Sequence, residues 1–491
     1  MSIEKPVELF GRDDEWVALS SFVQRPGPGV AVAMVYGRRR QGKTMLLEGL
    51  CDRGEGFLWQ AREQSAAQNL RSLEQAIGEF TGVTPRLDSW DAAVEAFCGL
   101  RRPQESNEQP LPVVLDEVGY LLDADPGFAS RLQAALAPLR NRRRKSSVRL
   151  ILCGSAFGQM RRLVDAGAPL RGRSQLDLVL RPFRFREAAE FWDLGNNPDL
   201  AFRLHALIGG TPAYREFAGG EAPTKGDLDR WVINHLLSVS SPLMNEGRTV
   251  VAEDPALHDR ALYWAVLGAV ADGAATRGEI TAALDRAPTA LHHALTALVD
   301  ADWLRVDQDP IRERSSRYSV GEPIVRFHRL VIEPAGARLT QRRTAADVWA
   351  EAMVTVRSRI FAPHLEHLAS EWLLLDADAT TTGGPVSQCG PSRVGTGSRA
   401  FKLDLLATVA DSRGVGKVSV VGEVKSGQER TGLDQLERLD TAVSMLDARR
   451  VAAPPKRLLV ARSGFTRELE QHARTRPEVE LIDLPRLYGG T

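Results

Sequence analysis

This sequence has little lysine, few cysteines, no net charge and no long hydrophobic run, and each of these absences narrows what the protein can be. Its 491 residues carry 63 basic and 63 acidic side chains, so any contact with nucleic acid must come from local patches. The four cysteines are scattered without CxxC spacing, which excludes a disulfide framework and a zinc site of that type. No apolar run approaches the roughly 20 residues that cross a bilayer, and the amino end lacks the layout of a signal peptide. The sequence therefore predicts a cytoplasmic protein with no membrane partner.

The length and composition predict three or four compact units. The chain is 43% hydrophobic and 26% charged, which is ordinary for folded globular proteins, and a typical domain has roughly 150 residues. Only eight of the basic residues are lysines, so a lysine stands out. Two of them, Lys43 and Lys425, fall inside the two motifs described below, where the chemistry requires a compact ammonium rather than a planar guanidinium.

A buried strand, a glycine-containing turn and a helix follow one another near the amino end. VAVAMVYG at 30–37 is typical of a strand, GRRRQGKT follows it, and MLLEGL begins a helix. The spacing Gly37-x4-Gly42-Lys43-Thr44 is that of a P-loop, where backbone N–H groups surround phosphates, the lysine reaches the β and γ oxygens, and the threonine ligates Mg²⁺. The sequence predicts that ATP and Mg²⁺ bind here, held by Gly37, Arg38, Arg39, Arg40, Gln41, Gly42, Lys43 and Thr44. The three arginines are either solvated charge or further phosphate contacts.

Two more strand patterns end in polar side chains that suit nucleotide hydrolysis. LPVVLDE at 111–117 ends in adjacent carboxylates, of which Asp116 would hold the metal and Glu117 would polarise the attacking water. The alternative is a strand that ends in a solvated acidic turn. VRLILCGS at 148–155 carries Ser155 at its tip, where it would sense the γ-phosphate or orient the water.

Five strand patterns alternate with helical stretches in this half of the chain. GFLWQAR at 56–62 and LDLVLRPF at 176–183 complete the set. This alternation predicts an α/β P-loop fold with a parallel sheet covered on both faces, and the ligand at the carboxyl ends of the strands.

Several motifs occur in the order and approximate spacing of a known family. They are FGRDDEWVAL (10–19), GRRRQGKT, LDEVGYLL (115–122), LILCGSA (150–156), PLRGRS (169–174) and IGGTPAY (208–214). With them the chain resembles the archaeal-type P-loop ATPases, relatives of the AAA+ and STAND nucleotide switches that usually carry a winged-helix region and a PD-(D/E)XK nuclease-like carboxyl domain.

The resemblance implies a domain plan and further site residues. It implies an ATPase core over 1–183, a helical lid over 184–250, a winged helix over 255–335 and a nuclease-like domain over 345–491. Phe10, Gly11 and Arg12 would lie near the adenine, and 209–212 would belong to the lid. Arg173 is the candidate arginine finger, because a guanidinium can neutralise charge on the transferring phosphoryl group. The alternative, given equal weight, is that Arg173 only solvates a loop.

The middle region has the pattern of a winged helix, but it lacks the basic side chains that would bind DNA phosphates. Thr276 and Glu279 have the spacing of a capping box, and Pro288 suits the first turn of the next helix. That next helix, 288–301, contains no lysine or arginine, and 255–335 holds nine arginines against eleven acidic residues. DNA affinity depends largely on cations that neutralise phosphates, so the sequence favours a packing or relay role over DNA reading.

The carboxyl-terminal region contains the second motif. Residues 380–399 are rich in Gly, Ser, Thr and Pro and predict a flexible loop. Two strand patterns follow, FKLDLLATVA with Asp404 and KVSVVGEVKSG with Glu423 and Lys425. Residues two apart on a strand face the same side, so these three side chains would share a pocket.

This arrangement is that of a PD-(D/E)XK nuclease. Asp404 and Glu423 would hold Mg²⁺ or Mn²⁺, with Glu366 on the preceding helix as a further ligand, and Lys425 would position or deprotonate the attacking water. The alternative is a nuclease-like fold kept as a binding module.

Three functional hypotheses follow. The leading one is an ATP-hydrolysing switch whose nucleotide state controls a metal-dependent DNA-cleaving domain. The second is an ATPase whose carboxyl domain only binds nucleic acid or a protein partner. The third is a winged-helix transcription regulator. A homo-oligomer or a protein partner is compatible with each.

Overall fold

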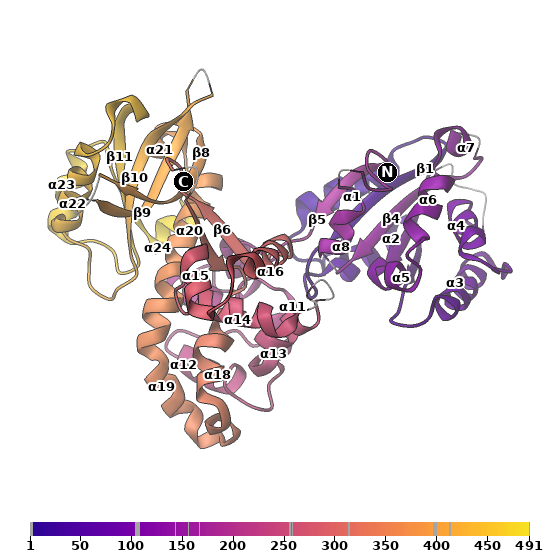
Figure 1. Ribbon diagram of the computed structural model, residues 1–491, viewed down its shortest axis with the longest axis horizontal. Helices are drawn as coiled ribbons and strands as arrows, with labels where there is room; N and C mark the ends of the chain where they lie inside the picture. The colour runs from indigo at the N-terminus through magenta and orange to yellow at the C-terminus, as the bar shows by residue number, and fades with distance from the viewer. Residues whose placement is uncertain are drawn as a thin grey trace. The chain divides into compact units, whose positions relative to one another are not determined.

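A computed structural model describes residues 3–103, 109–142, 144–155, 157–165, 167–254, 257, 259–312, 315–395, 400–411 and 414–490. The chain forms two compact units (Figure 1). The first extends to Pro182 and includes Asp254 and Leu257, and the second contains the remainder from Phe183 onward. Among the described residues, no helix combines the length and the apolar character needed to cross a membrane.

The first unit is built on a five-stranded parallel sheet. Its strands are β1 (Gly29–Tyr36), β2 (Phe57–Gln60), β3 (Leu111–Asp116), β4 (Ser147–Gly154) and β5 (Ser174–Val179). They are arranged in the order β2-β3-β4-β1-β5, and every neighbouring pair is parallel. Because β1 and β3 are buried along their whole length, they have no polar face, as expected for central parallel strands. The five strands predicted from the sequence are confirmed.

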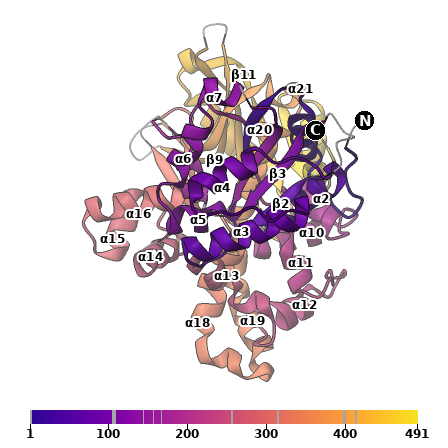
Figure 2. The ribbon, with the colours of Figure 1, turned by 90° about the vertical axis from the view of Figure 1, so that its right-hand side faces the viewer.

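Helices cover both faces of this sheet. Helices α1 (Asp13–Gln24) and α2 (Lys43–Gly54) pack on one face through residues such as Leu19 and Leu47. The other face carries α3 (Ala66–Thr81), α4 (Trp90–Cys98), α5 (Val118–Ala124), α6 (Phe128–Ala135) and α8 (Phe157–Arg162), as Figure 2 shows for α3 and α4. The short helix α7 (Pro138–Arg142) precedes β4. The sheet is therefore the middle layer of three.

The second unit begins with a helical region. Its helices are α9 (Phe185–Phe191), α10 (Pro198–Ile208), α11 (Ala213–Phe217), α12 (Leu228–His235) and α13 (Pro242–Ala252). These residues correspond to the predicted lid, and they cluster with the carboxyl-terminal half of the chain rather than with the sheet of the first unit.

Three helices and a hairpin follow, in the order of a winged helix. They are α14 (Arg260–Ala271), α15 (Arg277–Leu284), α16 (Pro288–Asp300), and the antiparallel pair β6 (Leu304–Gln308) and β7 (Ser316–Val320). The predicted capping box is present, since Thr276 and Glu279 bond each other's backbone at the start of α15. Short helical turns continue the chain: α17 (Pro323–Phe327), η1 (His328–Ile332), α18 (Glu333–Ala335), η2 (Gly336–Thr340) and η3 (Arg342–Thr344).

A long helical segment leads into a mixed five-stranded sheet. The segment runs through α19 (Ala345–Thr355), the π-helical turn η4 (Val356–Phe361) and α20 (Ala362–Leu375), and α21 (Ala379–Thr382) follows. The strands are β8 (Val386–Val394), β9 (Phe401–Ala410), β10 (Gly416–Lys425), β11 (Val451–Ala461) and β12 (Val479–Asp483), in the order β12-β11-β10-β9-β8. β8, β9 and β10 are antiparallel, whereas β10, β11 and β12 are parallel.

Helix α22 (Leu433–Ser444) packs its leucines against one face of this sheet, and α20 contacts β8, β9 and β10 (Figure 1). The remaining elements are η6 (Ala448–Arg450), α23 (Arg467–Arg474) and α24 (Leu484–Gly489).

The predicted flexible loop over 380–399 is wrong for much of its length. Residues Val386–Val394 form β8, the edge strand of the second sheet. An edge strand tolerates proline because one side of its backbone needs no partner. The pairing with β9 shifts between Gly390 and Ser392, on either side of Pro391. The composition of this segment is that of a loop, but its residues form an interrupted edge strand. Residues 396–399 lie outside the described residues.

Candidate nucleotide site and carboxylate clusters

The P-loop joins the end of β1 to the start of α2, and two glycines make its path possible. A Cβ atom at Gly37 would lie 2.1 Å from the carbonyl oxygen of Leu180, so no larger residue fits there. Gly42 has a φ of 83° at the N-cap of α2, a left-handed conformation that glycine adopts without strain. The loop therefore curls tightly over the N-terminus of α2, which attracts anions.

Lys43 lies inside this loop. Its ammonium Nζ donates to the carbonyl oxygens of Gly37 and Arg38, both at 2.8 Å. The side chain is buried, and this burial lowers the pKa of Lys43, while Asp116 and Glu117 act in the opposite direction. An ammonium held among loop carbonyls can exchange them for phosphate oxygens with little reorganisation.

A hydrogen bond connects the P-loop helix to the end of β3. The hydroxyl of Thr44 donates to Oδ2 of Asp116 at 3.0 Å, and the other carboxylate oxygen accepts from the backbone N–H of Glu117 at 2.8 Å. The Asp116 side chain is buried. A hydroxyl and a carboxylate that meet at one point are hard oxygen ligands of the kind Mg²⁺ uses beside phosphates, so these residues fit the predicted metal.

Glu117 and Ser155 lie together at the tips of β3 and β4. Glu117 has a φ of 51° at the N-cap of α5, which turns its side chain toward the neighbouring strand. Its Oε2 accepts from the hydroxyl of Ser155 at 2.8 Å and from the Ser155 backbone N–H at 3.3 Å. Two residues 38 positions apart therefore form one polar unit at the carboxyl edge of the sheet.

Arg12 contacts both the P-loop and the segment that follows β5. Its guanidinium donates to the carbonyl oxygen of Gln41 at 3.1 Å and to that of Arg181, just beyond β5, at 2.8 Å. The side chain is buried, whereas Phe10 is 37% exposed. Gly11 has a left-handed φ of 59° between them. Arg12 thus holds the loop and the end of β5 together, and the exposed ring of Phe10 is the member of this group that a ligand can reach.

The remaining P-loop side chains occupy different environments. Arg38 and Gln41 are buried, and Arg40 has a left-handed φ of 67°. Arg39 donates to the hydroxyl of Tyr120 at 2.6 Å. Tyr120 lies on the first turn of α5, four positions beyond Asp116, and was not singled out from the sequence. Its position one helical turn past a carboxylate-tipped strand is the signal that could have identified it.

Arg173 is not brought to this site. It directly precedes β5, and its guanidinium donates to the carbonyl oxygen of Leu136 at 2.7 Å. The far end of β5, Val179, pairs with Tyr36 at the start of the P-loop. Five residue steps along a strand span roughly 17 Å. Arg173 therefore lies toward the amino edge of the sheet, away from the P-loop.

In the second unit, Glu423 and Lys425 contact each other on β10. Lys425 Nζ lies 2.8 Å from Oε1 of Glu423, and Arg438 on α22 lies 3.7 Å from the same oxygen. Glu423 lies two positions after Val421 on β10, so the two side chains face the same side of the sheet. Val421 belongs to the core beneath α22. Oε2 of Glu423 is buried and accepts no hydrogen bond from the described residues. The predicted Glu–Lys pair is thus formed on the α22 side of the sheet.

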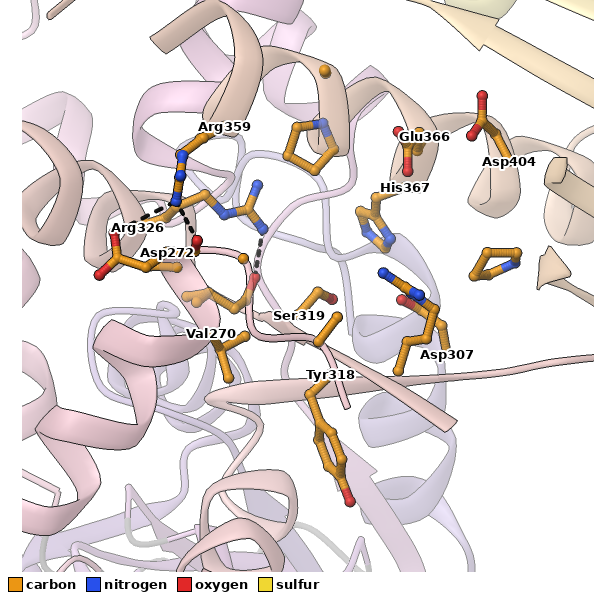
Figure 3. Close-up of a pocket in the computed structure, with 18 of the residues that line it drawn as sticks. Val270, Asp272, Asp307, Tyr318, Ser319, Arg326, Arg359, Glu366, His367 and Asp404 are labelled. Atoms are coloured by element: carbon orange, nitrogen blue, oxygen red, sulfur yellow. Dashed lines mark hydrogen bonds and ion pairs between the residues drawn. The ribbon is translucent and has the colours of Figure 1, made fainter. Parts of the chain in front are cut away.

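Asp404 and Glu366 line a different pocket. This cavity of about 370 Å³ is bounded by the winged-helix hairpin, α14, α20 and β9, and Figure 3 shows the two carboxylates near each other at one end. Burial, and next the charge of Asp404, raise the pKa of Glu366 to about 7. Oδ2 of Asp404 accepts from the backbone N–H of Val424 at 3.1 Å, and Lys402 lies 3.6 Å from Oδ1.

Arg326 also lines this pocket. It is buried and donates to the carbonyl oxygen of Val320 at 2.8 Å, and its burial lowers the pKa of the guanidinium to about 10. The sequence analysis does not single out Arg326, although an arginine inside the apolar run PIVRF is an unusual feature that could have identified it.

The three predicted metal ligands of the second unit are therefore not gathered at one point. The register of β8 and β9 shifts beside Asp404, where one residue of β8, Pro391, opposes two of β9, Asp404 and Leu405. Such a bulge reverses the alternation of side chains, so Asp404 joins Glu366 rather than Glu423. Over the described part of the chain, no three His, Cys, Asp or Glu side chains are grouped as a metal ion requires. Of the three predicted ligands, Asp404 and Glu366 lie together, whereas Glu423 contacts Lys425, so a metal centre would need a rearrangement around the bulge.

No protein-family profile matches this sequence, and no curated protein is similar enough to count as a relative. Among solved structures, the Walker-type ATPase of Pyrococcus abyssi matches with a TM-score of 0.50 and 19% identity, over 67% of this chain and 99% of that one. The ORC2 protein of Aeropyrum pernix in its ADPNP–ADP complexes matches with a TM-score of 0.39 and 16% identity, over 72% of this chain and 96% of that one.

A STAND protein with a tetratricopeptide-repeat sensor from Pyrococcus horikoshii matches with a TM-score of 0.27 and 14% identity, over 76% of this chain and 52% of that one. The first match, with the parallel sheet described above, shows that this chain has the fold of a P-loop ATPase.

Proposed function

We propose, from the P-loop ATPase fold, that this protein binds Mg–ATP in its first unit and hydrolyses it as a molecular switch. The observation that carries the proposal is the hydrogen bond of 3.0 Å between Thr44 and Asp116. It joins the two sequence motifs, one for phosphate and one for metal, at the carboxyl edge of the sheet, where ligands bind in open α/β folds.

Each side chain of the site then has a chemical role. Lys43 neutralises charge on the β and γ phosphates, and Thr44 and Asp116 would hold Mg²⁺, which when bound screens the charge of the phosphate tail. Glu117 accepts the proton of the attacking water. Ser155, bonded to the Glu117 carboxylate, orients it and is a positioning residue.

A switch also needs a part that responds to the nucleotide. The turn after α10 supports this role because it is closely packed: a Cβ atom at Gly210 would lie 1.9 Å from the carbonyl oxygen of Phe183. The predicted lid residues 209–212 form this turn and would pass nucleotide state on to the rest of the second unit. Since Arg173 bonds Leu136, a finger role for it requires a second molecule of the protein, and a homo-oligomer is part of the proposal.

Titration calorimetry with ATP tests the nucleotide proposal. Wild-type protein is expected to bind ATP more tightly with Mg²⁺ than with EDTA, and to release phosphate. Asp116→Asn should abolish the effect of Mg²⁺ and the turnover, whereas Asp88→Asn, an exposed aspartate of the same unit, should change neither. A wild-type protein that neither binds nor hydrolyses ATP would exclude the function.

A second candidate function is metal-dependent DNA cleavage by the second unit under nucleotide control. The observation that favours it is the 2.8 Å contact of Lys425 with Glu423, beside the Asp404 bond to the intervening Val424 backbone. Mg²⁺ or Mn²⁺ would require Glu423 to move toward Asp404 and Glu366, and when held by these carboxylates it would supply Lewis-acid stabilisation of the phosphodiester. The alternative is that this unit only binds nucleic acid or a protein partner.

Incubation with linear, nicked and supercoiled DNA separates these readings. With Mg²⁺ or Mn²⁺, with and without ATP, cleavage by wild type that Lys425→Ala abolishes would support the nuclease. Equal cleavage by both proteins, or none by wild type, would remove it. The third hypothesis, a winged-helix regulator, predicts sequence-selective DNA binding that survives Lys425→Ala.

A further inference from the structure

A groove in the second unit concentrates positive charge. Its lining includes Arg312, Lys417, Arg449 and Arg450, and none of its described lining residues is acidic. The chain as a whole has no net charge. Since the described lining holds four cations and no carboxylate, the local field there is positive, which the composition of the chain does not reveal.

These cations keep their charge available. Lys417 donates to the carbonyl oxygen of Arg449, and Arg450 donates to that of Ile311. Carbonyl partners fix the position of a side chain without neutralising it. Arg312, Arg449 and Arg450 are exposed and Lys417 is half-buried. The groove is thus both charged and pre-organised, which lowers the entropy cost of binding a polyanion.

Three chain segments far apart in the sequence supply the four cations of the groove. Arg312 lies on the turn between β6 and β7, which is the wing of the winged-helix region. Lys417 begins β10, and Arg449 and Arg450 belong to η6. The helix α16, by contrast, carries no lysine or arginine. The cationic surface of this region therefore lies on the wing side, not on the helix that would enter a major groove.

The lining chemistry selects one kind of occupant. The described lining contains no aromatic side chain. Single-stranded nucleic acid binds largely by stacking on aromatic rings, and protein interfaces usually have Trp and Tyr anchors beside their arginines. A duplex instead presents rows of phosphates that need only cations. We propose that this groove binds the phosphate backbone of a nucleic-acid duplex without reading its sequence.

This inference goes beyond the proposed function, because it requires neither ATP nor the carboxylates of the second unit. It is tested by fluorescence anisotropy with full-length protein, a labelled 20-base-pair DNA of mixed sequence, EDTA and no nucleotide, across a salt series. Each phosphate contact contributes about 0.9 to the slope of log K against log salt. The triple variant Arg312→Gln, Arg449→Gln, Arg450→Gln should lower that slope by about 2.7 and weaken binding by about 500-fold at 0.1 M salt.

A matched control removes the same charge elsewhere in the second unit. Arg230, Arg467 and Arg474 are exposed and do not line the groove, so their replacement by glutamine should leave the salt slope unchanged. Equal thermal melting of the three proteins would show that folding is intact. The proposal is overturned if wild type does not bind the duplex, if the control variant loses as much affinity, or if polyglutamate or phosphatidylserine vesicles bind this groove in preference to the duplex.

Discussion

Replacing Lys43 by alanine is the most direct test of the nucleotide site. The lysine ammonium donates two hydrogen bonds of 2.8 Å to loop carbonyls, and it is buried. The variant removes the only side chain of the P-loop that the motif assigns to the β and γ phosphates. Binding of Mg–ATP and its hydrolysis should both fall.

The magnitude follows from the bonds that are lost. A hydrogen bond to a charged group contributes about 1.5–3 kcal/mol, so losing one phosphate contact should raise the Kd for Mg–ATP by about 10- to 150-fold. Stability of the ligand-free protein should change little. The variant loses two bonds to carbonyls, but it also removes a buried ammonium, whose desolvation lowers the pKa of Lys43.

Titration calorimetry and phosphate release measure the two effects, and thermal melting measures stability. Lys145→Ala is the control, because Lys145 is an exposed lysine of the same unit, and it should behave as wild type. If Lys43→Ala binds Mg–ATP within threefold of wild type, Lys43 does not contact the phosphates and the assignment of the loop is refuted.

Three further changes have distinct expected outcomes. Glu117→Gln should keep ATP affinity within a few-fold while reducing phosphate release by at least 100-fold, because the amide cannot accept the proton of water; normal turnover would exclude Glu117 as the base. Arg173→Ala should leave turnover of dilute, monomeric protein within threefold in a phosphate-release assay, since its guanidinium bonds Leu136, and a loss of 10³ or more, the size of an arginine-finger effect, would contradict that placement. Burial lowers the pKa of His328 to about 4, because the folded protein favours the neutral imidazole. The contribution of His328 to the free energy of unfolding is therefore complete above pH 6.5. It is lost as the pH falls toward 4, by about 2 kcal/mol at pH 5. His328→Phe should flatten this loss in urea unfolding at pH 7 and pH 5, while His472→Gln at an exposed position should not; an unchanged pH dependence would show that His328 is not the group responsible.

The parallel sheet and the P-loop could be predicted because their signals are local. VAVAMVYG is apolar along its whole length, as β1 must be when both faces are covered. The spacing from Gly37 to Thr44 is contiguous, so the geometry of the loop follows from eight neighbouring residues. The capping box at Thr276 was predictable for the same reason.

Other expectations failed where distant segments decide the outcome. The composition of 380–399 predicts a loop, but pairing with β9 makes an edge strand of Val386–Val394. The alternation of residues on a strand predicts that Asp404 shares a pocket with Glu423. A shift in the register of β9 against β8 places Asp404 beside Glu366 instead. Such a shift cannot be predicted from a single sequence.

The order of residues along the chain established the P-loop, the strand that ends in Asp116 and Glu117, and the α/β layering, because these depend on periodicity and spacing within single segments. Tertiary structure alone decided that Arg173 lies away from the P-loop, that Arg12 supports this loop, that Asp404 lies with Glu366 and not with Glu423, and that Arg312 and Arg450 share a groove. The physical reason is that each of these depends on strand order and register, which bring together residues separated by tens to hundreds of positions.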